Sequence, residues 1–313
     1  MSKDKVTIIG GGLMGAGIAQ IFALSGHPVT VYGRLGGSIE KVREIIKSDC
    51  ELWVNYGVTT QEKAAAAQEL VSISHDMAEA VKDADFVVEA IAEKLELKQD
   101  TFRDIDSIAK PSAVLASSTS VISITEIAAK SKGRHRILGT HFWNPPGLIP
   151  LVEVVQTVHS DPRAIEYTMN ILTQAGKKAL HVKKDVPGFL ANRMQHALWR
   201  EAVSIVEQGI ADAATVDESI RTSFGLRLPI LAPMENADMV GLDLTLNIHE
   251  YILKHLEASP NPSPLLKEKV AAGDLGFKSG KGFQSWTPEA IAASRSRLKQ
   301  YLLEAAGKKR KDG

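Results

Sequence analysis

The chain has 313 residues, of which 44% are hydrophobic and 24% are charged, and its 37 Lys and Arg residues balance its 37 Asp and Glu residues. This length suits two globular domains, while the balanced charge argues against nucleic acid or a membrane as a partner. The single cysteine, Cys50, excludes an internal disulfide and a cysteine metal cluster, and no apolar run approaches the roughly 18 residues of a membrane span.

The first residues, MSKDKVTIIG, lead directly into an apolar run, so we expect no signal peptide and a cytoplasmic protein. Short β-rich runs then alternate with segments of helical periodicity, which predicts a mainly parallel sheet with helices on both faces. We expect strands at Val6–Ile9, Val29–Tyr32, Val71–Ile73, Phe86–Glu89, Val114–Ala116, Ile137–Phe142, Leu151–Val155 and Ala179–Val182.

After the segment DVPGF the pattern becomes helical throughout and β-rich runs disappear. We therefore place a boundary near Asp185–Pro187, between a dinucleotide-binding domain over 1–186 and a helical domain over 187–313. A long helix is expected just after the boundary, followed by helices over 214–222, 242–257, 264–272 and 287–305. The charged ending GKKRKDG is expected to be disordered.

A glycine-rich turn, G-x-G-x-x-G, lies between the first strand and the first helix. Gly10 suits the tight turn, Gly12 the close approach of a pyrophosphate, and Gly15 the packing of helix on strand. The free N–H groups at the helix start, which includes Leu13 and Met14, favour phosphate. This context predicts a Rossmann-type dinucleotide site.

The second strand ends at Gly33 and Arg34, where an Asp or Glu that selects NAD would be expected. A carboxylate about 5 Å from a 2′-phosphate would cost about 3 kcal/mol per unit charge, and its absence removes the main penalty against NADP. Arg34 could hold that phosphate through its planar set of donors. We predict NADP, with NAD as the alternative if Arg34 is only a solvated loop residue.

Four later stretches carry further candidates: DFVVEAIAEKLELK, VLASSTSVISITEIA, ILGTHFWNPPGLIPLVEVV and DVPGFLANRM. Together with the ending DLGFKSGKGFQSW they resemble the 3-hydroxyacyl-CoA dehydrogenase family, from about residue 5 to Trp286. The resemblance implies a nucleotide domain, a helical second domain that forms a homodimer, and an active site between them.

His141 and Glu153 are the candidates for acid–base catalysis. Oxidation of a secondary alcohol needs a base, and a positioned histidine suits that task. Their two strands can lie side by side, so that the carboxylate orients the imidazole and stabilises its cation. The alternative is a structural histidine beside a satisfied carboxylate.

Further roles follow from the resemblance. It implies that Ser120 and Asn192 hold the substrate oxygen, and that Glu93 and Lys98 lie near the nicotinamide ribose. Asn144 is expected to shape the turn and brace the substrate site. The alternatives are a helix cap for Ser120 and a satisfied interior amide for Asn192.

Two departures from the family concern the substrate. Members that act on coenzyme A thioesters carry basic groups on the long helix after the second strand, but here that region reads SDCELWVNYGVTT. The segment around Arg227 resembles the gulonate 3-dehydrogenase (lambda-crystallin-like) and carnitine dehydrogenase branch, whose substrates are free hydroxy acids. Arg227 could pair with a substrate carboxylate, or it could form a surface salt bridge.

The predicted function is hydride transfer between a nicotinamide cofactor and either a 3-hydroxyacyl-CoA or a free 3-hydroxy carboxylate. One alternative is a dehydrogenase of the 6-phosphogluconate and 3-hydroxyisobutyrate type, although its catalytic lysine has no counterpart in PGFLANRM. The other is a catalytically silent nucleotide-binding protein of the crystallin type. No histidine spacing predicts a metal site.

Overall fold

The computed structural model describes residues 3–34 and 38–311, and the chain divides into two compact units. The first unit comprises the residues up to Asn192 together with those from Leu298 onward, and the second comprises residues 193–297. Within the described ranges, no helix is long and apolar enough to cross a membrane.

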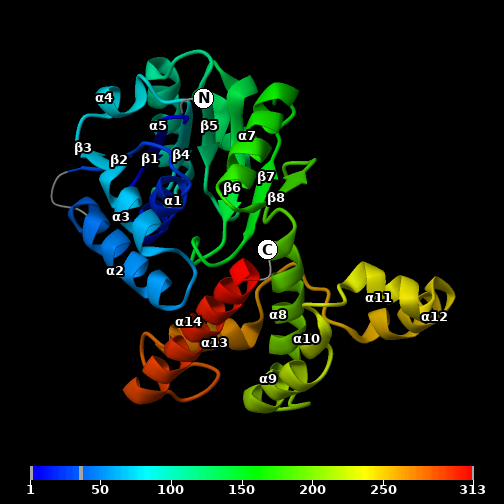
Figure 1. The fold of residues 1–313 in the computed structure, drawn as a ribbon. Coiled ribbons are helices and arrows are strands. Elements are labelled where there is room, and N and C mark those ends of the chain that lie inside the picture. Colours follow the sequence, from blue (N-terminus) through cyan, green and yellow to red (C-terminus); the bar gives the residue numbers. More distant parts are fainter. Residues whose placement is uncertain (1–2, 35–37, 312–313) are drawn as a thin grey trace. The chain divides into compact units, whose positions relative to one another are not determined.

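The first unit is built on an eight-stranded sheet with the order β3-β2-β1-β4-β5-β6-β7-β8 (Figure 1). The first six strands are parallel, β7 is antiparallel to β6, and β8 is parallel to β7. The strands are β1 (Val6–Ile9), β2 (Val29–Tyr32), β3 (Val71–Ser74), β4 (Phe86–Glu89), β5 (Val114–Ser117), β6 (Ile137–Phe142), β7 (Leu151–Val155) and β8 (Lys178–Val182). The predicted fold class is therefore confirmed, and each predicted strand is present within one residue at either end.

Helices cover both faces of this sheet, because the strands bury apolar side chains on both sides. One core lies under α1 (Leu13–Leu24), α2 (Val42–Asn55), α3 (Gln61–Glu69) and α7 (Pro162–Gln174). The other lies under α4 (Met77–Val81), α5 (Leu95–Ile108) and the short α6 (Ile124–Ile127). The odd-numbered residues Ile137 and Val155 belong to the second core, on the face where His141 and Glu153 also lie.

The second unit is helical. It contains α9 (Ala213–Thr222), α10 (Phe224–Arg227), α11 (Pro233–Val240), α12 (Leu242–Ile252) and α13 (Pro264–Ala271), together with most of α8 (Ala191–Glu207). The sequence pattern did not predict α10 and α11. The first is a single turn, and the second is a short segment that begins with Pro233 and exposes most of its side chains.

The last helix, α14 (Pro288–Lys311), ends in the first unit. Leu303, which is 1% exposed, packs with Trp53 of α2 and with Leu148. The helix continues through residues 307–311, where we had predicted disorder, because extending an anchored helix adds a hydrogen bond for each residue that it orders. Residues 312–313 lie outside the described residues.

Candidate active site

The glycine-rich loop has the backbone that a phosphate cradle requires. Gly10 has φ 116°, and a Cβ there would lie 2.6 Å from the carbonyl oxygen of Ala90. A Cβ on Gly15 would overlap the Gly10 carbonyl oxygen, so both positions need glycine. Gly12 faces open space and precedes α1, whose start has no side-chain cap. The loop therefore fits a pyrophosphate held by the N–H groups of Leu13 and its neighbours.

The end of β2 has no space for an acidic side chain at residue 33. A Cβ on Gly33 would lie 2.9 Å from the Cβ of Ile39, which is buried. The carbonyl oxygen of Gly33 binds the Nδ1 of His75 at 2.8 Å, and Arg34 follows with an exposed side chain. Residues 35–37, which follow Arg34, lie outside the described residues.

His141 and Glu153 are paired directly across β6 and β7. The two residues are in register, and His141 Nδ1 lies 2.7 Å from Glu153 Oε2. Both side chains are buried, 4% and 1% exposed. Because an ionised carboxylate only accepts hydrogen bonds, Nδ1 of His141 is the donor in this pair, and in a neutral imidazole the lone pair would then lie on Nε2.

The other oxygen of Glu153 is bound by the segment that leads into α8. Its Oε1 accepts the N–H groups of Leu190 at 2.9 Å and of Ala191 at 3.1 Å. Phe189, just before them, is fully buried, has φ 51° and lies with its ring 5.8 Å from that of His141. A left-handed residue at this turn lets successive N–H groups point at one anion.

These hydrogen bonds determine the ionisation of Glu153. Burial by itself would raise the pKa of this carboxyl group, but the hydrogen bonds from His141, Leu190 and Ala191 outweigh burial and lower the pKa. Glu153 therefore stays ionised at neutral pH.

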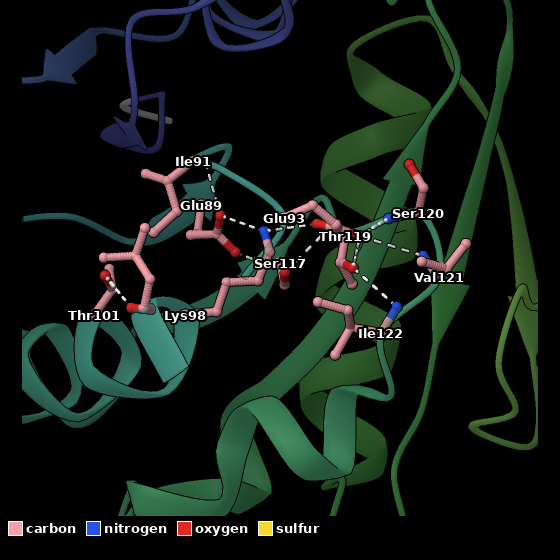
Figure 2. A network of polar contacts seen from close by, with 11 residues as sticks. Glu89, Ile91, Glu93, Lys98, Thr101, Ser117, Thr119, Ser120, Val121 and Ile122 are labelled. Carbon is pink, nitrogen blue, oxygen red and sulfur yellow. Dashed lines mark hydrogen bonds and ion pairs between the residues drawn. The ribbon is translucent and has the colours of Figure 1, made fainter. Parts of the chain in front are cut away.

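Ser120 lies in a loop that is held by Glu93 (Figure 2). Glu93 Oε1 accepts the N–H groups of Ser120 at 3.0 Å and Val121 at 3.4 Å, and also the hydroxyl of Thr119. The backbone of Ser120 is thereby fixed, while its exposed side chain has no hydrogen bond with any described residue.

Lys98 is buried next to this loop. Its Nζ is 2.7 Å from Glu89 Oε1 and 3.2 Å from Glu93 Oε2, and its side chain is 1% exposed. Glu89, fully buried at the end of β4, also accepts the hydroxyl of Ser117 and the N–H of Ile91. Of the two residues that we had expected near the nicotinamide ribose, Glu93 is thus the accessible one, with 39% of its side chain exposed.

Asn192 links the loop of Ser120 to the segment that binds Glu153. Its Nδ2 donates to the carbonyl oxygen of Ser120 at 3.0 Å, and it directly follows the two residues that bind Glu153. Asp185, seven positions earlier, accepts the Ser123 hydroxyl and the N–H groups of Ile124 and Thr125 at the start of α6. The segment 185–192 therefore holds both the Ser120 loop and the Glu153 carboxylate.

Asn144 and Arg227 are not part of this cluster of hydrogen bonds. Asn144 is exposed in the turn after β6, beside the cis peptide bond to Pro145. Arg227 ends α10 in the second unit, is exposed, and forms no ion pair with any residue in the described part of the chain.

Three residues of the site were missed by sequence reasoning: Glu89, Trp143 and Asp185. Glu89 and Asp185 could have been suspected, because each is an acidic residue at the end of an apolar strand or before a turn. Trp143, whose Nε1 lies 3.3 Å from Glu153 Oε2, gave no signal beyond its proximity to His141 in the sequence.

Comparisons with known proteins agree with this architecture. Residues 5–186 match the model of the 3-hydroxyacyl-CoA dehydrogenase NAD-binding domain, and residues 188–286 match the C-terminal domain of the same family. The chain is 33% identical, over 94% of its length and 95% of the relative's, to a 5-formyl-3-hydroxy-2-methylpyridine 4-carboxylate 5-dehydrogenase of Mesorhizobium japonicum. It is 35% identical to a probable 3-hydroxybutyryl-CoA dehydrogenase of Bacillus subtilis, over 91% of this chain and 98% of that one.

A solved structure extends the similarity to three dimensions. The crystal structure of a 5-formyl-3-hydroxy-2-methylpyridine 4-carboxylic acid 5-dehydrogenase, described as an NAD⁺-dependent dismutase, matches with a TM-score of 0.89 and 32% identity over 97% of both chains. The match covers nearly the whole of this chain, α14 included in large part. The protein is therefore a member of the 3-hydroxyacyl-CoA dehydrogenase family, an oxidoreductase with an NAD-binding Rossmann-type domain and a helical C-terminal domain.

Proposed function

We propose that this protein transfers a hydride between a nicotinamide cofactor and the hydroxyl-bearing carbon of a small 3-hydroxy carboxylate, with His141 as the general base. The observation that carries the proposal is the buried pair of His141 Nδ1 and Glu153 Oε2 at 2.7 Å. In the oxidation direction, His141 Nε2 accepts the hydroxyl proton while Glu153 stabilises the resulting imidazolium. The bound cofactor would accept the hydride.

Ser120 and Asn192 are proposed to hold the substrate oxygen. The Ser120 hydroxyl is exposed, while its backbone is fixed by Glu93 and Asn192. A hydroxyl group can donate to a ketone and accept from an alcohol, so one residue serves both ends of the reaction. Asn192 lies next to Ser120, because its Nδ2 donates to the Ser120 carbonyl oxygen.

For the cofactor we propose NADP. Gly10, Gly12 and the start of α1 would hold the pyrophosphate, and Glu93 would face the nicotinamide ribose. The packing of Gly33 against Ile39 supports the preference, because an acidic residue that selects NAD would displace Ile39. Arg34 would then pair with the 2′-phosphate.

A free carboxylate is proposed in place of a coenzyme A thioester for two reasons. Arg227 has an exposed guanidinium without an ion pair in the described residues, which leaves it free to bind a carboxylate. In addition, α14 packs on α2 through Leu303 and Trp53, and α2 is the helix to which the resemblance assigns the coenzyme A phosphates. The similarity to a pyridine-carboxylate dehydrogenase favours the same class.

The cofactor and the substrate are tested in one set of assays. Purified protein is supplied with NADPH or NADH, and with acetoacetyl-CoA or free acetoacetate. We expect turnover with NADPH and the free acid, and we expect Arg34→Ala to raise the KM for NADPH more than tenfold while changing that for NADH less than twofold. Turnover with acetoacetyl-CoA alone would assign the thioester. Equal effects of Arg34→Ala on both cofactors would remove Arg34 from the cofactor site, and no turnover with any pair would favour a catalytically silent protein.

The base assignment has its own test. His141→Gln should lower kcat by about 10²–10⁴-fold, the typical contribution of a positioned general base, and leave the Kd for NADPH nearly unchanged. The matched control is His159→Gln, which changes an exposed histidine of the same unit. Normal turnover of His141→Gln would exclude His141 as the base.

We also propose that the protein is a homodimer formed through the second unit. Many large apolar side chains of that unit are exposed, more than a soluble monomer normally leaves in contact with water. They include Leu226, Ile230, Met234, Met239, Leu242, Leu246 and Tyr251. Light scattering coupled to gel filtration should give twice the chain mass, and a monomer at micromolar concentration would contradict the proposal.

A cytoplasmic location is proposed from the free, buried Cys50, because a free thiol is typical of a reducing compartment.

A further inference from the structure

The indole of Trp143 contacts both members of the His141–Glu153 pair. Its Nε1–H donates to Glu153 Oε2 at 3.3 Å, which is the same oxygen that accepts the Nδ1–H of His141 at 2.7 Å. The indole and imidazole rings also lie 5.2 Å apart. Trp143 is two residues beyond His141 and directly follows β6, which ends at Phe142.

With the indole included, Glu153 has four hydrogen-bond donors. Two backbone N–H groups bind Oε1, while Trp143 and His141 bind Oε2. A carboxylate has about four lone-pair positions, so all of them are used. The charge on Oε2 is shared between two donors, and an oxygen that is shared stabilises each donor less than an oxygen with a single partner.

We propose that Trp143 is a positioning residue that fixes Glu153 Oε2 and limits how strongly this oxygen stabilises the protonated form of His141. The indole thereby sets the pH above which His141 is available as a base. The inference rests on the proposed role of His141 for its effect on activity, but its effect on the ionisation of the ring does not depend on that role.

Among the described residues, no further titratable side chain of the neighbouring elements is bound to the His141–Glu153 pair. In the first unit, β6 packs against β5, β7, α6 and α7, and β7 packs against β8. The titratable side chains of these elements are Glu126, Arg163, Glu166, Tyr167, Lys178 and His181, besides His141 and Glu153 themselves, and the segment 185–192 that binds Glu153 adds Asp185. None of these seven forms a hydrogen bond or ion pair with His141 or Glu153 among the described residues: Arg163 binds Asp161, His181 binds Gln156, and Asp185 binds residues 123–125.

The decisive variant is Trp143→Phe, which keeps an aromatic ring beside His141 and removes the N–H. The ring of His141 is titrated by NMR in protein labelled at the histidine Cε1 position, with the His141 signal assigned from His141→Gln. We expect the titration midpoint to rise by about 0.5–1 pH unit, the effect of removing one competing donor to a charged acceptor. In the oxidation direction the acid limb of kcat/KM should move by the same amount, which lowers activity below the midpoint by about three- to tenfold.

Two controls separate this effect from packing. Trp199→Phe changes an exposed tryptophan of the second unit and should move neither the midpoint nor the limb. Replacement of Trp143 by β-(3-benzothienyl)alanine keeps the bicyclic shape without the N–H, should act like Trp143→Phe, and remains informative if Trp143→Phe fails to fold.

The outcomes are distinct. If the titration midpoint of His141 does not move in either Trp143 variant, the proposal is overturned. It is also overturned if kcat/KM falls at alkaline pH while its acid limb stays in place, since that is the result of lost packing. A midpoint that moves while the acid limb stays in place would support the role of Trp143 and contradict His141 as the base.

Discussion

Glu153 is a buried carboxylate whose ionised form is held by its neighbours, and this makes its contribution to stability depend on pH. Its pKa is lowered because hydrogen bonds from His141, Leu190 and Ala191 outweigh the raising effect of burial. A carboxyl group with a lowered pKa in the folded state stabilises the fold above its ordinary value of 4.5. That stability is lost as the pH falls through the lowered pKa.

Glu153→Gln should therefore destabilise the protein by about 2–4 kcal/mol at pH 7, since donors that face a buried charge lose their partner. The difference from the wild type should shrink as the pH falls below 4.5. Urea unfolding at a series of pH values measures it, with the exposed Glu126→Gln as the control. A difference that stays constant down to pH 3 would show that the charge of Glu153 adds nothing to stability.

The buried ion pairs of Lys98 support the loop that carries Ser120. Its ammonium group is enclosed by Glu89 and Glu93, and Glu93 in turn holds the Ser120 loop. Replacing Lys98 by Met would leave the buried Glu89 without its counter-charge, a change that typically costs about 3–5 kcal/mol. We expect a large fall in the free energy of unfolding, measured by urea denaturation. The matched control is Lys130→Met, which removes a surface ion pair with Asp100 and should cost less than about 1 kcal/mol. Similar losses for both variants would contradict this assignment.

The segment 185–192 connects the loop of Ser120 with the carboxylate of Glu153. Asp185 accepts three hydrogen bonds from residues 123–125 and so ties this segment to the start of α6. Because Ser120 lies just before that start, the position of its hydroxyl depends on a residue more than sixty positions away.

Asp185→Ala should lower the free energy of unfolding by about 1–3 kcal/mol, as for the loss of a helix cap with charge-assisted hydrogen bonds. It should also raise the KM for the substrate more than it raises the KM for the cofactor, since the glycine loop is not touched. Steady-state kinetics and urea unfolding give both quantities. Asp161→Ala, which removes the N-cap of α7, is a control with a similar cost in stability and an unchanged KM. A normal KM in Asp185→Ala would separate this segment from the substrate site.

At the scale of the whole molecule, the chain returns to its first unit at the end. The segment beyond residue 286, where the family match stops, adds α14, and Leu303 on this helix is buried against Trp53 and Leu148. Trp53 also fits against Gly147, where a Cβ would overlap its ring, so the C-terminal helix supports the turn that joins the strands of His141 and Glu153.

Leu303→Ala should destabilise the protein by about 2–4 kcal/mol, the range for a leucine truncated in a packed core. Leu298→Ala, on the same helix with 59% of its side chain exposed, should change the stability by less than about 0.5 kcal/mol. Thermal or urea unfolding of the two variants measures the difference. Equal effects would show that α14 is not anchored by Leu303.

The sequence by itself determined the local parts of this protein. Apolar runs of three to six residues placed the strands, because a strand buried on both faces is recognisable from its own side chains. The pairing of His141 with Glu153 followed from two neighbouring strands joined by a short turn, and the three glycines of the loop followed from their spacing. In each case the residues that matter lie close together in the chain.

Only the tertiary structure decided which distant segments meet. The burial of Lys98 between Glu89 and Glu93, the N–H groups that Leu190 and Ala191 offer to Glu153, and the return of α14 to α2 all join segments that lie apart in the sequence or on different elements. Periodicity indicates that a side chain is buried, but it does not indicate its partner. The physical reason is that a hydrogen bond or an ion pair is formed by two specific groups, whereas burial is a property of one residue at a time.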